Sequence, residues 1–481
     1  MLFKLSEITI CKDRYKFVSY LLGGIRKLYR RSLFCTMTGA HCKLSGIKPD
    51  YLKKFVFKKN VYLAPNINQK KVTMRRFTFL LLFLCLAATT AFSGGYQIGL
   101  HSMRNVGMGL IGTSLSYDAS TLFYNPGGAA FINEKWSFTG GVSFLMIRTT
   151  FQATDVNYQT HLKHQLNTPI YFYAAFKPTK NLSVGLAVNT PYGNSLGWED
   201  NWKGRFLIQN LSFKAFTFQP TVSYKFKDII GIGIGLVYAY GDVDLNKAIP
   251  YEGATGEGSL NVKGTASNFG FNAGIMVHPV KGLSLGLDYR STIKMKVKGG
   301  NATFKVPTSL STSFPNTKVD VMLPLPANLD FGASYEFGKF MVGINLCYVF
   351  WNTYDSLVFT FDKVSDDQAI TRSASPTLYE NRLIPRVGVQ YMINKLITVR
   401  VGGYYDPSPV PSDYLNPQTP SVDQVGLTCG FSIYPTKGLS IDAAFLYVMG
   451  AERSGTYLPD NFSGTYRNAV YSPGIGLTYN F

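Results

Sequence analysis

Alternation of apolar and polar residues with a period of two constrains this chain more than any other feature. Apolar side chains recur at every second position in segment after segment from Trp136 to Phe481, for example across 283–289 and 439–447. This period is typical of β-strands with one apolar face. Mean hydropathy is only +0.03 and charged residues make up 16%, so the apolar residues are not gathered into the long runs of a multi-helix membrane protein.

The connections between these segments indicate which kind of β-protein forms. Six short connections alternate strictly with seven longer ones, one of which we expect at 245–264, and this gives 14 strands with both ends on the short-turn side. Outer-membrane barrels have short periplasmic turns, long outer loops and an even strand number, and closure leaves no strand edge in lipid. The pattern therefore predicts an all-β fold: a 14-stranded antiparallel transmembrane β-barrel over 135–481, in the bacterial outer membrane.

The N-terminal part has a different character. Residues 74–93 combine two arginines, an apolar run and small residues at their end, which is the pattern of a secretory signal peptide. Residues 1–73 contain 16 Lys and Arg against 3 acidic residues. We interpret 1–73 as an upstream basic extension outside the mature protein; the alternative is a basic arm for nucleic acid, which fits poorly with export.

Residues 94–134 lack the alternation and are rich in glycine. A segment of this kind before the first strand could hang in the periplasm or fold into the lumen. A 14-stranded barrel is wide enough to need filling unless it is an open pore.

Several motifs in this segment and in the barrel resemble those of one family. They are Gly95-Tyr96-Gln97, Gly107-Met108-Gly109, Asp118-Ala119-Ser120, Tyr124-Asn125-Pro126-Gly127, Pro191-Tyr192-Gly193, Gly204-Arg205-Phe206, Asp288-Tyr289-Arg290-Ser291, Leu325-Pro326-Ala327 and Ser408-Pro409-Val410-Pro411. In order and spacing the chain from 94 to 481 resembles the FadL family of outer-membrane transporters for long-chain fatty acids and other hydrophobic compounds. One departure is Gly127, where the family commonly has Ala.

The resemblance implies a barrel closed by an N-terminal hatch, here 94–134, with Asn125, Pro126 and Gly127 as hatch residues; by itself Asn-Pro could be an ordinary turn. It also implies passive uptake: capture of a hydrophobic ligand at outer loops, a lumenal pocket, hatch rearrangement and lateral exit beside a kinked third strand. Gly185 lies in the predicted third strand and is the candidate for the lateral opening, unless it is simply one of many barrel glycines.

Basic residues are the candidates for binding the carboxylate of such a ligand. Strand parity turns Arg290, Arg386 and Arg400 toward the lumen, where they either contact the ligand or hold the hatch through ion pairs. Arg205 in an outer loop is a candidate for ligand capture or for loop packing. Lys294 and Lys296 are predicted to share the face of Arg290 higher on its strand, as outer capture residues or as a solvated stripe.

No cofactor, metal site or catalytic constellation is expected, and the chain is predicted not to be an enzyme. The expected partners are a hydrophobic small molecule, membrane lipid, lipopolysaccharide and the outer-membrane assembly machinery, with no nucleic acid. Two other functions remain as alternatives: a general porin for small solutes, and a surface adhesin or receptor that uses the long outer loops.

Overall fold

The computed structural model describes residues 35–38, 41–44, 95–251 and 256–481. The chain divides into two units, the first of which ends at Leu86. Within the first unit, β1 (Cys35–Thr38) and β2 (His41–Leu44) form an antiparallel hairpin. The predicted signal peptide, 74–93, lies outside the described residues, as does most of the predicted extension 1–73.

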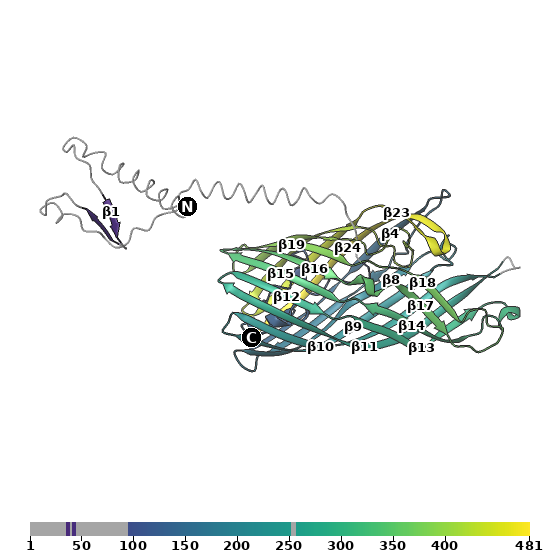
Figure 1. Ribbon diagram of the computed structural model, residues 1–481, viewed down its shortest axis with the longest axis horizontal. Helices are drawn as coiled ribbons and strands as arrows, with labels where there is room; N and C mark the ends of the chain where they lie inside the picture. Colours follow the sequence, from purple (N-terminus) through teal and green to yellow (C-terminus); the bar gives the residue numbers. More distant parts are fainter. Residues whose placement is uncertain (1–34, 39–40, 45–94, 252–255) are drawn as a thin grey trace, which may run out of the picture. The chain divides into compact units, whose positions relative to one another are not determined.

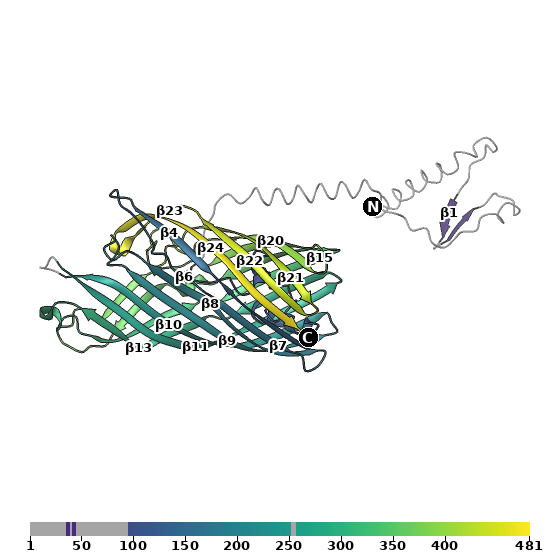
Figure 2. The same ribbon diagram turned by 180° about the vertical axis from the view of Figure 1, so that it is seen from behind.

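The second unit is a closed antiparallel barrel whose wall consists of 14 strands, several of them interrupted (Figures 1 and 2). In chain order the wall strands are β3 (Trp136–Ser143) with β4 (Leu145–Ala153); β5 (Gln159–His161), β6 (Leu166–Asn167) and β7 (Ile170–Phe176); β8 (Leu182–Gly197); β9 (Asn210–Phe226); β10 (Ile230–Pro250); β11 (Glu257–Val280); β12 (Leu283–Arg290) with β13 (Ile293–Lys305); β14 (Thr317–Leu325) with β15 (Asn328–Phe337); β16 (Phe340–Val349) with β17 (Ser356–Phe361); β18 (Arg372–Pro376) with β19 (Arg382–Met392); β20 (Ile397–Asp406); β21 (Gln424–Thr436); β22 (Leu439–Gly450) with β23 (Arg453–Tyr457); and β24 (Phe462–Asn480).

The last strand closes the barrel on the first. β24 pairs with β3 through Ile475 opposite Val142, and with β4 through Tyr471 opposite Met146. Closure gives the strands at both ends of the sheet a hydrogen-bonding neighbour, which a lipid environment requires. The predicted 14-stranded barrel is therefore confirmed.

Parity along the strands gives the barrel its two faces. On β12, Leu287 is 44% exposed on the outer surface, whereas its neighbour Asp288 is 3% exposed in the interior. Large apolar side chains cover the outside of the other strands in the same way, for instance Ile234 on β10 and Phe331 on β15. This arrangement reverses that of a soluble protein, because the solvent of the outer face is hydrocarbon.

The connection predicted at 245–264 is largely strand. β10 runs to Pro250 and β11 begins at Glu257, and the two remain paired up to Pro250 opposite Glu257. The polar residues that suggested a loop lie in a hairpin beyond the apolar band, where the ladder continues although the outward side chains are no longer apolar.

Residues 95–134, which we call the hatch, fold inside the barrel. They contain the short helices α3 (Met103–Val106) and α4 (Thr121–Tyr124) and the 3-10 helix η2 (Pro126–Phe131), and nearly all residues from 100 to 130 are buried. The outer connections hold three further 3-10 turns: η3 (Thr308–Leu310), η4 (Trp351–Thr353) and η5 (Leu458–Asp460). Among the described residues, none of the helices has both the length and the apolarity needed to cross a bilayer.

Glycines allow the hatch backbone to lie directly on the barrel wall. A Cβ atom at Gly127 would lie 2.7 Å from the carbonyl oxygen of Gly274 and 2.8 Å from that of Gly231. Both contacts are to backbone, which cannot swing aside as a flexible side chain can. Gly127, the position at which the chain departs from the FadL pattern, is therefore the residue that this close approach requires.

We expect the Gly127→Ala variant to unfold with a free energy lower by about 1–3 kcal/mol, because the added methyl group overpacks the contact between hatch and wall. Denaturant unfolding of the detergent-solubilised barrel measures this. Gly140→Ala is the matched control, since a Cβ there meets its nearest neighbours at an ordinary 3.5 Å. Equal stability of the two variants would contradict the packing described here.

Candidate functional site: a lumenal cavity beside an interruption in the wall

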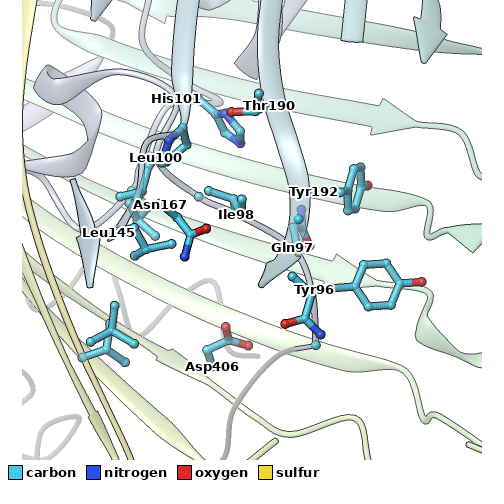
Figure 3. A pocket seen from close by; sticks show the side chains of 18 of the residues that line it. Tyr96, Gln97, Ile98, Leu100, His101, Leu145, Asn167, Thr190, Tyr192 and Asp406 are labelled. Carbon is cyan, nitrogen blue, oxygen red and sulfur yellow. The ribbon is translucent and has the colours of Figure 1, made fainter. Parts of the chain in front are cut away.

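A cavity of about 450 Å³ lies in the lumen above the hatch. Figure 3 shows the hatch residues Tyr96, Gln97, Ile98, Leu100 and His101, with Thr190 and Tyr192 of β8 beside them and Asp406 at the end of β20. Apolar side chains such as Leu145 and Leu446 line it together with Arg290 and Arg386. Its volume falls in the range of small-molecule sites, and so does its mixture of an apolar lining with a few polar groups.

Arg290 connects the cavity to the hatch. Its Nη1 donates to Gln219 Oε1 of β9 (3.0 Å), and its Nη2 donates to the backbone carbonyl of Phe123 (2.7 Å). The guanidinium also lies over the Phe123 ring, 4.2 Å from the centroid. No carboxylate lies within 4.0 Å of it among the described residues, so the charge is held by neutral acceptors and an aromatic face.

Arg386 holds the hatch at a second point. Its Nη1 donates to the carbonyl oxygen of Leu110 (3.1 Å), which follows Gly109 in a turn where both residues have positive φ, +65° for Leu110 and +71° for Gly109. Its Nε is buried and has no hydrogen-bond acceptor among the described residues. Arg386 therefore has a donor to spare at the wall of the cavity.

Arg400, the third predicted lumenal arginine, faces inward but does not line the cavity. Its Nε donates to Gln390 Oε1 (2.8 Å) and its Nη1 to Ser432 Oγ (2.5 Å). It lies against the hatch: a Cβ added at Gly107 would be 3.5 Å from the Cβ of Arg400. The structure thus brings two of the three arginines together at the cavity and leaves the third beneath the hatch.

One buried ion-pair network between hatch and wall involves a residue that the sequence analysis missed. Arg104 of α3 pairs with Asp118 of the hatch (3.0 Å) and Asp442 of β22 (3.6 Å), and also donates to Ser440 Oγ (2.8 Å). The ion pairs proposed as an alternative for the lumenal arginines are made instead by this hatch arginine. Its presence as a basic residue in a segment otherwise poor in charge was the one signal available.

Asn125 fixes the hatch from within. Its side-chain nitrogen donates to the carbonyl oxygens of Thr113 (2.8 Å) and Ile275 (2.9 Å), and its Oδ1 accepts from Gly127 N–H (3.0 Å). The last contact caps η2, in which Pro126 occupies the first turn as is common at helix starts. The Asn-Pro-Gly segment is thus more than a surface turn, because Asn125 joins two separate segments of the hatch to each other and to β11.

The wall is interrupted between its second and third strands. The β7–β8 ladder ends at Tyr171 opposite Asn189, and in this described part of the wall β6 pairs with β4 and not with β8. In the β8–β9 ladder, Asn189 opposes Thr217 and Tyr192 opposes Ala215. β8 therefore has one residue more than β9 between these pairs, which is a β-bulge.

Gly185 does not mark this irregularity. It is paired in regular register with Ala175 on β7 and Thr221 on β9, and a Cβ there would lie 2.6 Å from Leu122 of the hatch. The irregularity in β8 lies instead at Thr190 and Pro191, because the extra residue of the bulge is found there; the regular pairing of Gly185 agrees with the alternative that it is one of many barrel glycines.

The start of the hatch hydrogen-bonds to the edge of β8 that β7 leaves unpaired. Ile98 N–H donates to the carbonyl of Pro191 (2.9 Å), and Gly193 N–H donates to the carbonyl of Tyr96 (3.0 Å). The Tyr96 ring lies among aromatic rings, 5.0 Å from Trp351 and 5.7 Å from Tyr354 between centroids. This segment therefore supplies backbone partners that the second strand does not.

Arg205 is occupied in the outer loops. Its Nε donates to both carboxylate oxygens of Glu257 (2.9 and 2.8 Å), and its guanidinium lies 4.5 Å from the centroid of the Phe206 ring. Hydrogen bonding from Arg205 lowers the pKa of the Glu257 carboxyl, because it favours the charged form. The geometry favours loop packing over the alternative of a free cation for ligand capture.

The prediction that Lys294 and Lys296 share the face of Arg290 is wrong. β12 ends at Arg290 and β13 begins at Ile293, and across this break the buried face moves to Ile293 and Met295. Ser291 causes the step: its Oγ accepts from Phe271 N–H and its own N–H donates to Phe271 O, both at 2.9 Å. Lys294 and Lys296 consequently point to the outside of the barrel.

Among residues 95–251 and 256–481, no group of three or more His, Cys, Asp or Glu side chains is arranged to hold a metal ion. The loop histidines His161 and His164 do not belong to such a group; His161 Nδ1 lies 3.0 Å from Thr150 Oγ1.

Removing one member of the Arg104 network should loosen the hatch. We expect Arg104→Ala to lower the free energy of unfolding by about 3–5 kcal/mol, because Asp118 and Asp442 would remain buried without their cation. Lys163→Ala, which breaks the exposed pair with Asp200, should cost at most about 1 kcal/mol. Denaturant unfolding in micelles compares them, and similar losses for both variants would contradict a buried network.

Comparison with known proteins agrees with this architecture. Residues 84–481 match the family model described as outer membrane protein transport protein (OMPP1/FadL/TodX). A long-chain fatty acid transport protein of Salmonella typhi is 20% identical over 399 residues, which cover 76% of this chain and 90% of the relative.

Two solved structures have the same fold. A FadL homologue of Pseudomonas aeruginosa superposes with a TM-score of 0.70 at 18% identity, covering 80% of this chain and all of that one. The Pseudomonas putida toluene transporter TodX superposes with a TM-score of 0.61 at 15% identity, covering 82% and 100%. The match over 398 residues confirms the resemblance seen in the motifs and the expectation of a transport protein and not an enzyme: the chain belongs to the OMPP1/FadL/TodX family of outer-membrane transport proteins.

Proposed function

We propose that this protein takes up long-chain fatty acids or similar apolar anions across the outer membrane without an energy source. The observation that carries the proposal is a lumenal cavity that has Arg290 and Arg386 on its wall and also reaches Thr168, Pro169 and Thr190 at the wall interruption. In this proposal one ligand-sized space adjoins both the site for a carboxylate and the way out to lipid. The relatives' names, which include fatty acid and toluene transporters, agree with apolar cargo.

The cavity lining holds Asp288, Asp330 and Asp406 as well as basic residues, so a free arginine donor, and not the net charge, favours an acidic head group over a neutral hydrocarbon. Arg386 Nε is a buried donor without an acceptor among the described residues, and an unsatisfied buried donor costs free energy that a ligand oxygen would recover. Apolar residues such as Leu145, Ile147 and Val470 on the same wall suit an alkyl chain. A neutral aromatic molecule would use the apolar part alone.

The same arginines couple the ligand to the hatch. Arg290 and Arg386 each donate to a hatch carbonyl, of Phe123 and of Leu110, and a carboxylate is a stronger acceptor than a neutral carbonyl. A bound acid would compete for these donors and weaken two attachments of the hatch. In this proposal hatch rearrangement follows from capture of the head group.

Lateral exit would use the interruption between the second and third wall strands. There the hatch segment Tyr96–Ile98 takes the place of a neighbouring strand through two backbone hydrogen bonds. Movement of that segment would leave the edge of β8 without partners for the short time in which the ligand passes into lipid. The density of hatch packing is unfavourable to the porin alternative, since a general porin needs an open lumen.

The adhesin alternative has less support. Outer-loop aromatics are turned inward, as the stacked Trp198 and Trp202 rings (centroids 4.5 Å apart) with Phe151 against them show. These side chains are buried against one another and are not presented to a partner.

Oleate binding to the purified protein tests the head-group site. We expect saturable binding that weakens about tenfold or more in Arg386→Ala and Arg290→Ala, since a charge-assisted hydrogen bond contributes about 1.5–3 kcal/mol. Arg400→Ala is the matched control, because Arg400 faces the lumen without lining the cavity, and it should bind as the unmodified protein does. Equal weakening in all three variants would point to hatch collapse and would contradict a specific site.

Deletion of Pro191 tests the exit. Removing one residue would return β8 to regular register with β9 and allow it to approach the second strand. We expect oleate uptake into cells to fall to background while binding to the purified protein persists. Pro191→Ala keeps the residue count and should retain uptake; unchanged uptake in the deletion variant would rule out this route.

A further inference from the structure

Five lysines project outward from three adjacent strands near the outer end of the barrel. We call them the lysine patch: Lys263 on β11, Lys294, Lys296 and Lys298 on β13, and Lys318 on β14. All five are exposed. The intervening residues Ile293, Met295 and Val297 are buried inside the barrel, so the lysines cannot reach the lumen.

Strand pairing brings these side chains together. Lys263 and Lys318 lie opposite Asn301 from the two sides of β13, and Lys318 Nζ donates to Asn301 Oδ1 (2.7 Å). Two carboxylates share the surface: Asp320 pairs with Lys296 (3.0 Å) and Asp244 with Lys263 (3.1 Å). Among the described residues, the ammonium groups of Lys294 and Lys298 have neither a hydrogen bond nor an ion pair, so the patch keeps an excess of positive charge.

The patch stands at the height of the lipid head groups. Lys294 is eleven residues along the seventh wall strand from Leu283 at the periplasmic end. With ~3.3 Å per residue and a tilt of about 40°, this corresponds to roughly 28 Å along the barrel axis. An outer-membrane barrel has an apolar band of about 25 Å, so the lysines begin where the band ends.

Directly below the patch lies a surface suited to acyl chains. Phe269 and Phe271 on β11 are 59% and 44% exposed, and the rings of Phe271 and Tyr289 are in contact, with centroids 5.7 Å apart. Aromatic residues of this kind mark the interface between hydrocarbon and head groups. Cationic groups above an aromatic and aliphatic surface match an amphiphile with an anionic head and several chains.

We propose that the lysine patch binds the phosphate groups of a phosphorylated glycolipid of the outer leaflet. The phosphate oxygens bind Lys294 and Lys298, whose ammonium groups have no protein acceptor, and Lys296 contributes from between them. The acyl chains lie along Phe269, Phe271 and Tyr289. This interaction is independent of the transported ligand, since the lysines are on the other face of the wall from the cavity.

The test uses protein purified from membranes and titrated in micelles with bisphosphorylated lipid A, its phosphate-free form or inorganic phosphate, with bound species counted by native mass spectrometry. We expect saturable binding of lipid A, little binding of the phosphate-free form, and no displacement of lipid A by millimolar inorganic phosphate. Equal binding of the two lipid forms would overturn the proposal. Displacement by inorganic phosphate would overturn it as well, because it would indicate a site for free anions.

A variant with Lys294→Gln, Lys296→Gln and Lys298→Gln should bind lipid A at least about tenfold more weakly. The control carries Lys281→Gln, Lys395→Gln and Lys437→Gln, which remove the same charge from exposed positions at periplasmic turns, and should bind normally. The change in gel mobility between unheated and heated samples verifies that each variant is folded. Equal affinity of the two variants would overturn the assignment, and the comparison of the two lipid forms on unmodified protein decides the matter even if a variant fails to fold.

Discussion

Closure of the sheet is the constraint on which everything else in this molecule depends. In lipid a backbone N–H or C=O group without a partner costs several kcal/mol, and β24 pairs with β3 and β4 to remove the free edges. The interruption between the second and third wall strands is covered from inside by the backbone of Tyr96 and Ile98. The hatch therefore supplies hydrogen-bond partners to the wall as well as filling the lumen.

This arrangement links three parts of the molecule through few atoms. Arg290 and Arg386 hold hatch carbonyls and line the cavity, while the first hatch residues cover the interruption beside the same cavity. In the proposed function a ligand that occupies the cavity would act on the hatch and on the exit together. The Arg104 network, by contrast, ties the hatch to β22 away from the cavity, which suits a permanent anchor.

The sequence predicted the barrel well because apolar and polar residues alternate along a strand whose two faces meet lipid and the lumen. Leu287 and Asp288 lie on opposite faces as parity requires. The same reasoning failed three residues beyond Arg290, because the Ser291 hydroxyl accepts a hydrogen bond from Phe271 N–H of the neighbouring strand and the faces shift there. No sequence pattern indicates this shift. Parity arguments therefore hold within one uninterrupted ladder and not across a break.

The site was only partly predictable for a related reason. A glycine suggested a bend at Gly185, whereas the bulge at Thr190 and Pro191 depends on how many residues β8 and β9 each contribute, which is a property of two strands. Arg104 was missed because the hatch has no periodicity from which to infer orientation. The sequence did identify Arg290 and Arg386 as inward-facing, but which arginines meet at the cavity depends on where the hatch lies.

Photo-crosslinking with a long-chain fatty acid that carries a diazirine near the end of its alkyl chain tests the central claim most directly. If the cavity holds the acid and the wall interruption is the exit, crosslinked peptides from the purified protein will contain the cavity residues Leu145 and Ile147 and the edges of the interruption at Pro169 and Thr190. Crosslinks confined to the outer loops, or to the periplasmic turns, would contradict the account.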